Sequence, residues 1–428
     1  MRFAISFSSL TSASGRNRSS LSRSSHARSS LSGSFLPIFA SLSLLAIFAL
    51  TSLASVQAQT EIILHSFAGT TDGEFPTSGL VTDGQGNFYG GATGDTDFGT
   101  GEATVFTIDS AETFSVLHTF TPSFTGLAVE VSGLTLDSQG NLNGTAYNAT
   151  PDPLLTFQIT SAGAFNILAP TGPIGPGNAP GSIPGVVLDA QHNVYVAAYS
   201  THCPDSGSGA TCTIVKITPG GKVSTVHTFG GSGSVTFSGI LGLTMDAQGN
   251  LYATVDAGNE FESQYSICKI TPAGKTTVLH KFVDTSNAII LGALTVDAEG
   301  NIYGTAPENN VLSHGIIFKR TPAGKVTTLF RFNGTDGSLQ NDQSGPGALV
   351  LDAAGNLWGA TPAGGSHGQG SVFKLSPAGV LTTLHNFGDS ADDGKIPNGI
   401  ILDNSGNLFG TTYSGGANNL GTVFKITP

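Results

Sequence analysis

Short apolar runs alternate with turn residues from residue 61 to residue 428, which is the pattern of β-strands joined by tight turns. One unit contains the β-type run 243–245, the turn Asp246–Asn250 with Gly249 at its fourth position, and a second run that opens at Leu251. We interpret this unit as a β-hairpin. The Asp that opens the turn recurs at intervals of 51 to 57 residues, at Asp83, Asp137, Asp189, Asp246, Asp297, Asp352 and Asp403.

A second hairpin follows each of these turns after a loop of variable length, for example over residues 316–330. Each repeat therefore holds four strands, A to D. Four short strands in a repeat of this length are typical of a propeller blade, since solenoid coils use shorter repeats. We expect an all-β, seven-bladed β-propeller.

The two ends of the repeat region complement each other. The last repeat stops at residue 428, one strand short, whereas residues 61–67 match strand D of other repeats, as in residues 382–387. We therefore expect the N-terminal strand to close the last blade of a single domain, residues 59–428. A closed ring leaves no sheet edge for another chain, so we expect a monomer.

Two sequence motifs carry a resemblance to a known family. The patterns G-x-x-F-K-I-T-P-A-G-x-x-T-T-L-H-x-F and D-x-x-G-N-L-Y-G-T-T-x-x-G-G resemble the GloVer-type tandem repeats of secreted bacterial proteins. The resemblance covers residues 61–428 and is sharpest over residues 407–428. It implies export and no known catalytic residues.

Residues 1–58 have the features of a secretory signal peptide. Residues 1–34 are rich in Ser and contain five Arg and no acid, and an apolar run over residues 35–53 leads to the small-x-small triplet Val56-Gln57-Ala58. A membrane anchor is the alternative, because the apolar run approaches the length of a bilayer span. We expect a secreted protein, located outside the cell, on its surface or in the periplasm, with no membrane span in the mature chain.

The charge balance excludes a class of partner. All 29 acids but only 12 of the 17 Lys and Arg follow residue 58, which gives the mature chain a net charge of −17. We expect no nucleic-acid partner, since no basic excess is available to neutralise phosphates.

Three Cys in 428 residues also exclude a disulfide scaffold.

The recurrent Asp and His residues suggest metal sites, but we favour structural roles for both. An Asp at the start of a turn accepts backbone N–H groups, whereas calcium binding would need additional converging oxygens. Five His occupy one place in strand D, the outermost strand, and are too far apart to share a metal ion. Alternation along the strand predicts that they face away from the packed side. We expect no metal or other cofactor. The five are His65, His118, His227, His280 and His385.

The cysteines divide into a pair and a single residue. Cys203 and Cys212 lie in one loop, where an exported protein can keep them oxidised, so we expect a local disulfide. Cys268 stands where other repeats have Phe318 or Phe373, so we expect it to be buried and free.

The two faces of the predicted ring differ in charge. The A–B and C–D turns are short and uniform, whereas the B–C and D–A loops are variable and carry 18 acids against one base, Lys395. We expect this acidic face to bind a glycan, a cation or a surface protein, with no catalysis. The candidate binding residues are Glu260, Phe261, Glu262, Glu308, Asp342 and Tyr413.

The alternative function is that of an extracellular propeller enzyme. A carbohydrate-active hydrolase or lyase would need acidic groups to converge at the channel mouth. The inner strands are expected to contribute no carboxylate before the turn Asp, which favours the binding interpretation.

Overall fold

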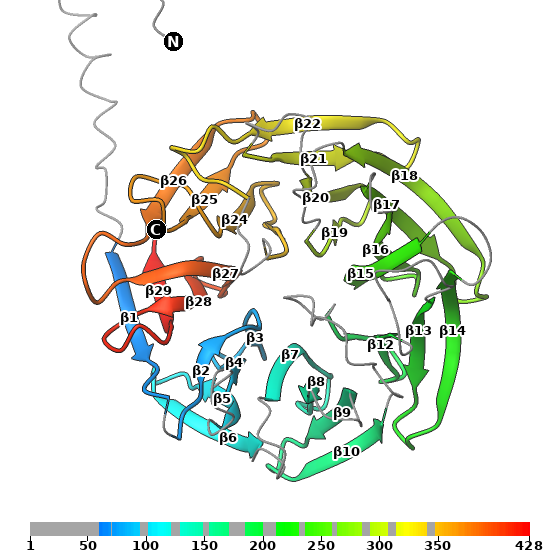
Figure 1. Cartoon of the computed structure of the whole chain (residues 1–428), viewed down its shortest axis with the longest axis horizontal. Helices are drawn as coiled ribbons and strands as arrows, with labels where there is room; N and C mark the ends of the chain where they lie inside the picture. Colours follow the sequence, from blue (N-terminus) through cyan, green and yellow to red (C-terminus); the bar gives the residue numbers. More distant parts are fainter. Residues whose placement is uncertain are drawn as a thin grey trace, which may run out of the picture. The chain divides into compact units, whose positions relative to one another are not determined.

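The computed structural model describes residues 60–69, 71–94, 102–120, 129–148, 154–170, 185–199, 211–230, 236–258, 263–284, 292–306, 314–339 and 347–428. All of them belong to one compact unit, Gln57–Pro428. They form seven antiparallel sheets arranged as the blades of a ring, which confirms the predicted seven-bladed propeller (Figure 1). The described residues include no helix, and therefore none that could cross a membrane.

The strands of each blade run outward from the centre in the order A, B, C, D (Figure 1). The innermost A strands are β2 (Glu74–Pro76) with β3 (Val81–Thr82), β7 (Val129–Leu136), β11 (Val187–Leu188), β15 (Thr236–Met245), β19 (Thr295–Val296), β23 (Val350–Leu351) and β27 (Gly394–Leu402). The B strands are β4 (Phe88–Thr93), β8 (Leu142–Asn148), β12 (Val194–Tyr199), β16 (Leu251–Gly258), β20 (Ile302–Ala306), β24 (Leu357–Thr361) and β28 (Leu408–Gly415).

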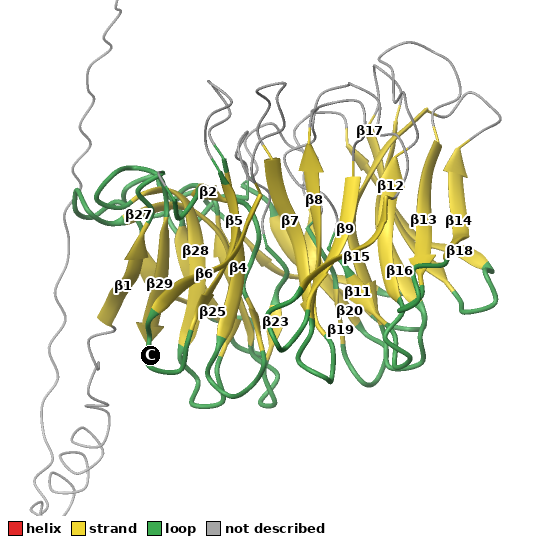
Figure 2. Cartoon of the chain, turned by 90° about the horizontal axis from the view of Figure 1, so that it is seen from below, coloured by secondary structure: helices red, strands yellow, loops and turns green. Residues whose placement is uncertain are grey.

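The outer half of each blade consists of a C strand and a D strand. The C strands are β5 (Ala103–Ile108), β9 (Leu154–Ile159), β13 (Thr211–Ile217), β17 (Ser263–Ile270), β21 (Ile316–Arg320), β25 (Ser371–Leu375) and β29 (Thr422–Thr427). The D strands are β6 (Phe114–Phe120), β10 (Phe165–Pro170), β14 (Val223–Gly230), β18 (Thr276–Asp284), β22 (Val326–Arg331), β26 (Leu381–Asn386) and β1 (Thr60–Ser66). Figure 2 shows the strands side on, with the short turns along one face.

The N-terminal strand closes the ring as predicted. Strand β1 pairs antiparallel with β29, from Thr60 opposite Thr427 to Ser66 opposite Thr422. The last sheet therefore has the order β1-β29-β28-β27 and contains both ends of the repeat region. This pairing covers the outer edge of β29, which would otherwise be an exposed sheet edge.

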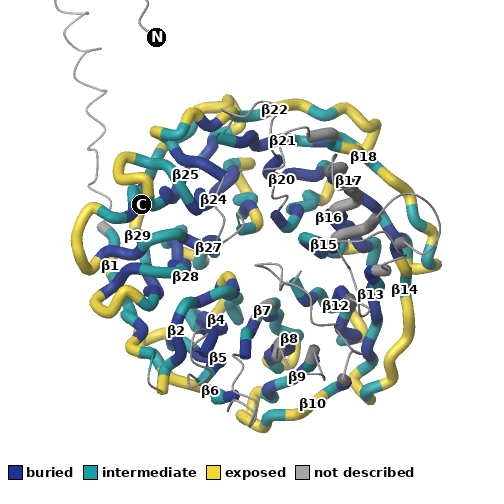
Figure 3. The backbone as a smooth tube through the Cα atoms, in the orientation of Figure 1, coloured by how far each residue is buried: buried dark blue, intermediate teal, exposed yellow. Residues whose placement is uncertain are grey.

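The core of most blades depends on a Phe packed over a Gly. Phe106, Phe157, Phe318, Phe373 and Phe424 on the C strands are fully buried. Each lies opposite a B-strand Gly, where an added Cβ would meet the Phe ring at 3.0 Å or less. The buried stretches in Figure 3 follow the B and C strands in the middle of the blades.

Two blades fill the same space with a different pair. In the fourth blade Ala253 lies opposite Cys268, and in the third Val196 lies opposite Val215. In each pair the B-strand residue is larger than Gly and the C-strand residue is smaller than Phe, so the core stays filled. Cys268 is a free, buried thiol in the place of the Phe, as the sequence predicted.

Candidate functional site

The seven turn Asp side chains are occupied by hydrogen bonds within their own hairpins. Each accepts the backbone N–H of the Asn four residues later at 2.7–3.2 Å and the side-chain Nδ2 of that Asn at 2.6–2.9 Å. This is the Asx-turn arrangement expected of a structural Asp. His192 takes the place of the turn Gly with φ 61°, in the left-handed region that Gly adopts in the other turns.

Aromatic and basic side chains complete the network on this uniform face. Tyr195, Tyr252, Tyr303 and Trp358 donate hydrogen bonds of 2.9–3.1 Å to the turn Asp of their own hairpin. A Lys from the C strand lies 4.5–5.5 Å from the centre of the neighbouring ring in five blades. The repeated polar groups of this face therefore stabilise the blades themselves.

Most of the predicted binding residues lie outside the described part of the chain. These are Glu260, Phe261, Glu262, Glu308 and Asp342. Tyr413 in β28 is described, is half-buried and stacks on Phe75, with ring centres 5.1 Å apart. Their binding role stays a prediction.

The predicted disulfide is also untested. Cys203 lies outside the described residues, and Cys212 is buried in β13.

The five D-strand His do not face away from the packed side, so that prediction is wrong. Every D strand has a β-bulge at the residue just before this position, for example Leu384 before His385. The bulge shifts the alternation by one residue and turns the His toward the buried side. Each His ring then lies edge-on to the Phe two residues later, with centres 4.4–4.9 Å apart.

At four junctions the His that follows the bulged residue contacts the start of the next D strand around the rim. His65 stacks on Phe114 at 3.6 Å and His118 on Phe165 at 3.8 Å between ring centres. Between the third and fourth blades, Thr276 Oγ1 lies 3.0 Å from His227 Nδ1. The residues at the start of the seven D strands, each opposite the same C-strand position, are Phe114, Phe165, Val223, Thr276, Val326, Leu381 and Glu61.

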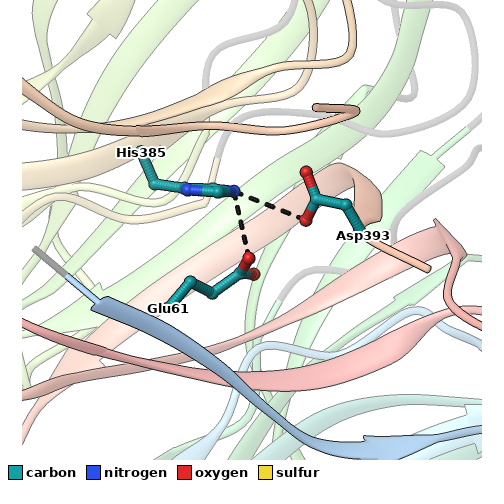
Figure 4. Close-up of side chains that lie close together, drawn as sticks. All are labelled: Glu61, His385 and Asp393. Carbon is teal, nitrogen blue, oxygen red and sulfur yellow. Dashed lines mark hydrogen bonds and ion pairs between the residues drawn. The ribbon is translucent and has the colours of Figure 1, made fainter. Parts of the chain in front are cut away.

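The junction that closes the ring brings three ionisable side chains together. His385 Nε2 on β26 lies 3.2 Å from Glu61 Oε2 on β1 and 3.4 Å from Asp393 Oδ1 in the loop before β27 (Figure 4). The side chains are 14%, 13% and 1% exposed, in that order. Within the described ranges, this is the only group of three His, Cys, Asp or Glu residues whose ligand atoms all lie within 4.8 Å of one another.

Asp393 is held in place by the loop that carries it. Its Oδ2 accepts the backbone N–H of Gly388 at 2.5 Å and that of Asp389 at 3.1 Å. The next junction around the ring uses the same device, because Asp72 Oδ2 accepts from Ala68 N at 3.0 Å and lies 2.9 Å from His65 Nε2. The His–Asp contact is therefore a recurrent loop anchor, and Glu61 is the addition specific to the closing junction.

The electrostatics of the cluster follow from burial and mutual charge. Burial raises the pKa of Glu61 to about 8, with Asp393 adding to the shift and His385 opposing it. Burial alone would lower the pKa of His385, but the hydrogen bond to Asp393 and the nearby carboxylates raise it. Burial likewise opposes ionisation of Asp393, but its bonds to His385 and the loop N–H groups lower its pKa. The cluster thus favours a charged His385–Asp393 pair beside a protonated Glu61.

Two carboxylates lie on inner strands, against the sequence expectation: Glu74 on β2 and Glu130 on β7. Strand β7 begins at Val129, so Glu130 lies within it. Burial raises the pKa of Glu130 to about 7. The loop-like sequence before Gly133 concealed this extension of the strand.

The sequence pattern distributes the members of the closing cluster over three separate features. Asp393 belongs to the acidic loops, His385 to the D-strand His, and Glu61 to the N-terminal strand. The signal was available in the alignment of the repeats, because Glu61 occupies the position of Phe114 and Phe165. An acid at a position that is aromatic or uncharged in every other repeat marks a special site.

Residues 338–428 match the sequence model of the Gloeobacter/Verrucomicrobia repeat, which confirms the predicted GloVer-type repeat over those residues. No curated protein matches the chain.

Solved structures similar to this chain include several enzymes. They include a prolyl endopeptidase (13% identity, TM-score 0.44, covering 83% of this chain and 51% of that one) and a gluconolactonase from Xanthomonas campestris (14%, 0.40, 69% and 85%). A protein of unknown function from Dyadobacter fermentans is also similar (10%, 0.45, 87% and 100%). This chain spans about half the length of the prolyl endopeptidase chain. Identities this low say nothing about activity.

Proposed function

We propose that this protein is an exported, non-catalytic propeller that binds a glycan, a cation or a surface protein through its variable loop face. The uniform face offers little from which to build a specific site, because its Asp side chains are occupied by their own turns. The variable loops carry the acid excess and differ from blade to blade. A scaffold that keeps one face constant and varies the other is suited to recognition.

The stacked pair Phe75 and Tyr413 is the observation that carries this proposal. Phe75 lies in β2, directly before Pro76, at φ 44°, a conformation that a bulky residue rarely adopts. Its N–H donates to Leu420 O in the B–C loop of the last blade, which fixes it beside Tyr413. Strained residues held by their surroundings cluster at binding sites, and aromatic rings next to carboxylates suit sugars or cations.

A binding screen with paired variants tests the proposal. The purified protein and two loop-face variants are screened against glycans and cations. The variants are Phe75→Ala/Tyr413→Ala and Glu260→Gln/Phe261→Ala/Glu262→Gln. The opposite-face control is Lys222→Gln/Lys275→Gln/Lys325→Gln. We expect the loop-face changes to weaken binding at least tenfold and the Lys changes to leave it intact. Loss of binding in the Lys variant alone would show that the wrong face was chosen.

Glu130 favours a second candidate, a carbohydrate-active hydrolase or lyase with its site at the channel. A carboxyl group with a pKa of about 7 on an innermost strand has the property of a general acid–base group. Turnover of a polysaccharide that is abolished by Glu130→Gln, with the fold intact, would support this activity over simple binding.

A further inference from the structure

The closing junction buries two carboxyl groups around one imidazole. Among the described residues, Glu61 and Asp393 supply the carboxyl groups, and His385 contacts both. Glu61 Oε1 is buried and receives no hydrogen bond. A buried carboxyl oxygen without a donor is costly, and a cation bound among the three side chains would replace the proton on Glu61 and give its carboxylate a partner.

The donor atoms match one kind of positive group closely. An imidazole nitrogen and carboxylate oxygens are zinc ligands, with Zn–N and Zn–O bonds of about 2.0–2.2 Å. Ligand atoms around a tetrahedral ion at that radius are about 3.3–3.6 Å apart. The 3.2 Å and 3.4 Å distances from His385 Nε2 to the two carboxylates are close to this spacing.

We propose that Glu61, His385 and Asp393 bind a zinc ion that fastens the N-terminal strand to the sixth blade. Three protein ligands leave the fourth position of a tetrahedral ion to water. The ligands come from β1, from β26 and from the loop before β27, so the ion would join both ends of the repeat region. Asp393 is already oriented by the N–H groups of Gly388 and Asp389, which lowers the ordering cost of binding.

The neighbouring junction shows what the site would be without its third ligand. His65 and Asp72 repeat the His–Asp contact and its backbone anchor, but the residue in the place of Glu61 is Phe114, which stacks on the His65 ring. The site therefore depends on Glu61, and the His65–Asp72 pair provides a matched control within the same chain.

A metal titration of the full chain tests the proposal. Protein stripped with EDTA and dialysed is titrated with zinc chloride by calorimetry, its bound zinc is measured by mass spectrometry, and its melting temperature is recorded with and without zinc. The same measurements are made on Glu61→Gln and on the control Asp72→Asn. We expect one zinc per chain, a rise in melting temperature, at least tenfold weaker binding in Glu61→Gln, and unchanged binding in Asp72→Asn.

Three outcomes would overturn the proposal. The first is that the stripped protein binds no zinc, and the second is that Glu61→Gln binds zinc as tightly as the unaltered chain. The third is a rise in melting temperature with zinc that is unchanged in Glu61→Gln, which would place the stabilising ion at another site.

Discussion

The junction between β26 and β1 differs from that between β1 and β6 in a single residue type. Both have a His directly after a bulged Leu, a loop Asp that contacts the His, and a backbone N–H that donates to the Asp. Where the β1–β6 junction places Phe114 against the His ring, the closing junction places Glu61. The pKa of His65 is lowered by burial despite Asp72, whereas that of His385 is raised.

This difference shows how a repeat architecture can acquire a local property without changing its fold. Six junctions pack a D-strand start that is aromatic, aliphatic or a Thr, and the seventh uses an acid. This acid, Glu61, lies on the N-terminal strand β1, which must pair in register with β29 of the last blade. A buried polar group at this place costs desolvation, and such groups serve in some proteins to favour one pairing over competing ones.

Removal of the N-terminal strand should produce the largest effect. A chain that begins at residue 68 loses the β1–β29 pairing and the fully buried Phe67. The loss should exceed the roughly 3–5 kcal/mol of one buried Phe, because a sheet edge is exposed as well. Thermal unfolding measures it, and a synthetic peptide of residues 59–67, but not a scrambled one, should restore the transition. An unchanged melting temperature after the deletion would refute closure by this strand.

The two loop anchors should differ in their contribution to stability. Asp393→Ala removes the acceptor of the Gly388 and Asp389 N–H groups. Because the Asp393 side chain is only 1% exposed, the change should cost about 2–3 kcal/mol of unfolding free energy. Asp72→Ala removes the acceptor of one exposed N–H, that of Ala68, and should cost about 1 kcal/mol. Urea unfolding of both variants checks the order, and equal costs would show that the closing junction is not specially held.

Glu61→Phe converts the closing junction into a copy of its neighbours. Without metal, this variant should be as stable as the unaltered chain or more stable, by about 0.5–1.5 kcal/mol, because a ring would stack on His385 and a buried carboxyl would be lost. Unfolding in EDTA measures this change. A marked loss of stability would mean that Glu61 contributes through protein contacts alone.

The smallest effect should come from the ordinary junctions, through pH. Burial lowers the pKa of His118, and no charged group contributes to its shift. The unfolded chain binds this proton more readily, so the stability that His118 contributes is complete above the unfolded pKa of 6.5 and is lost as the pH falls through the lower folded pKa. His118→Phe should therefore make the decline in stability from pH 7 to pH 5 shallower. A decline identical to that of the unaltered chain would contradict the packing assigned to this ring.

The fold was predictable because its determinants are local and repeated seven times. Asp246 to Asn250 specifies its own turn, and the match between residues 61–67 and strand D predicted the closure. The closing cluster was not predicted, because its three residues are joined by the bulge before His385 and by the register of β1. The prediction assumed unbroken alternation along strand D, and a bulge adds one residue to one strand and shifts that alternation.

The most direct test of the difference between the junctions is an anomalous-difference map at the zinc absorption edge, from crystals of the chain grown with zinc. The account predicts one strong peak at the closing junction, about 2.0–2.2 Å from His385 Nε2 and from an oxygen of each of Glu61 and Asp393, and none at His65 and Asp72. A map without a peak there, with His385 still about 3.2 Å from Glu61, would contradict it.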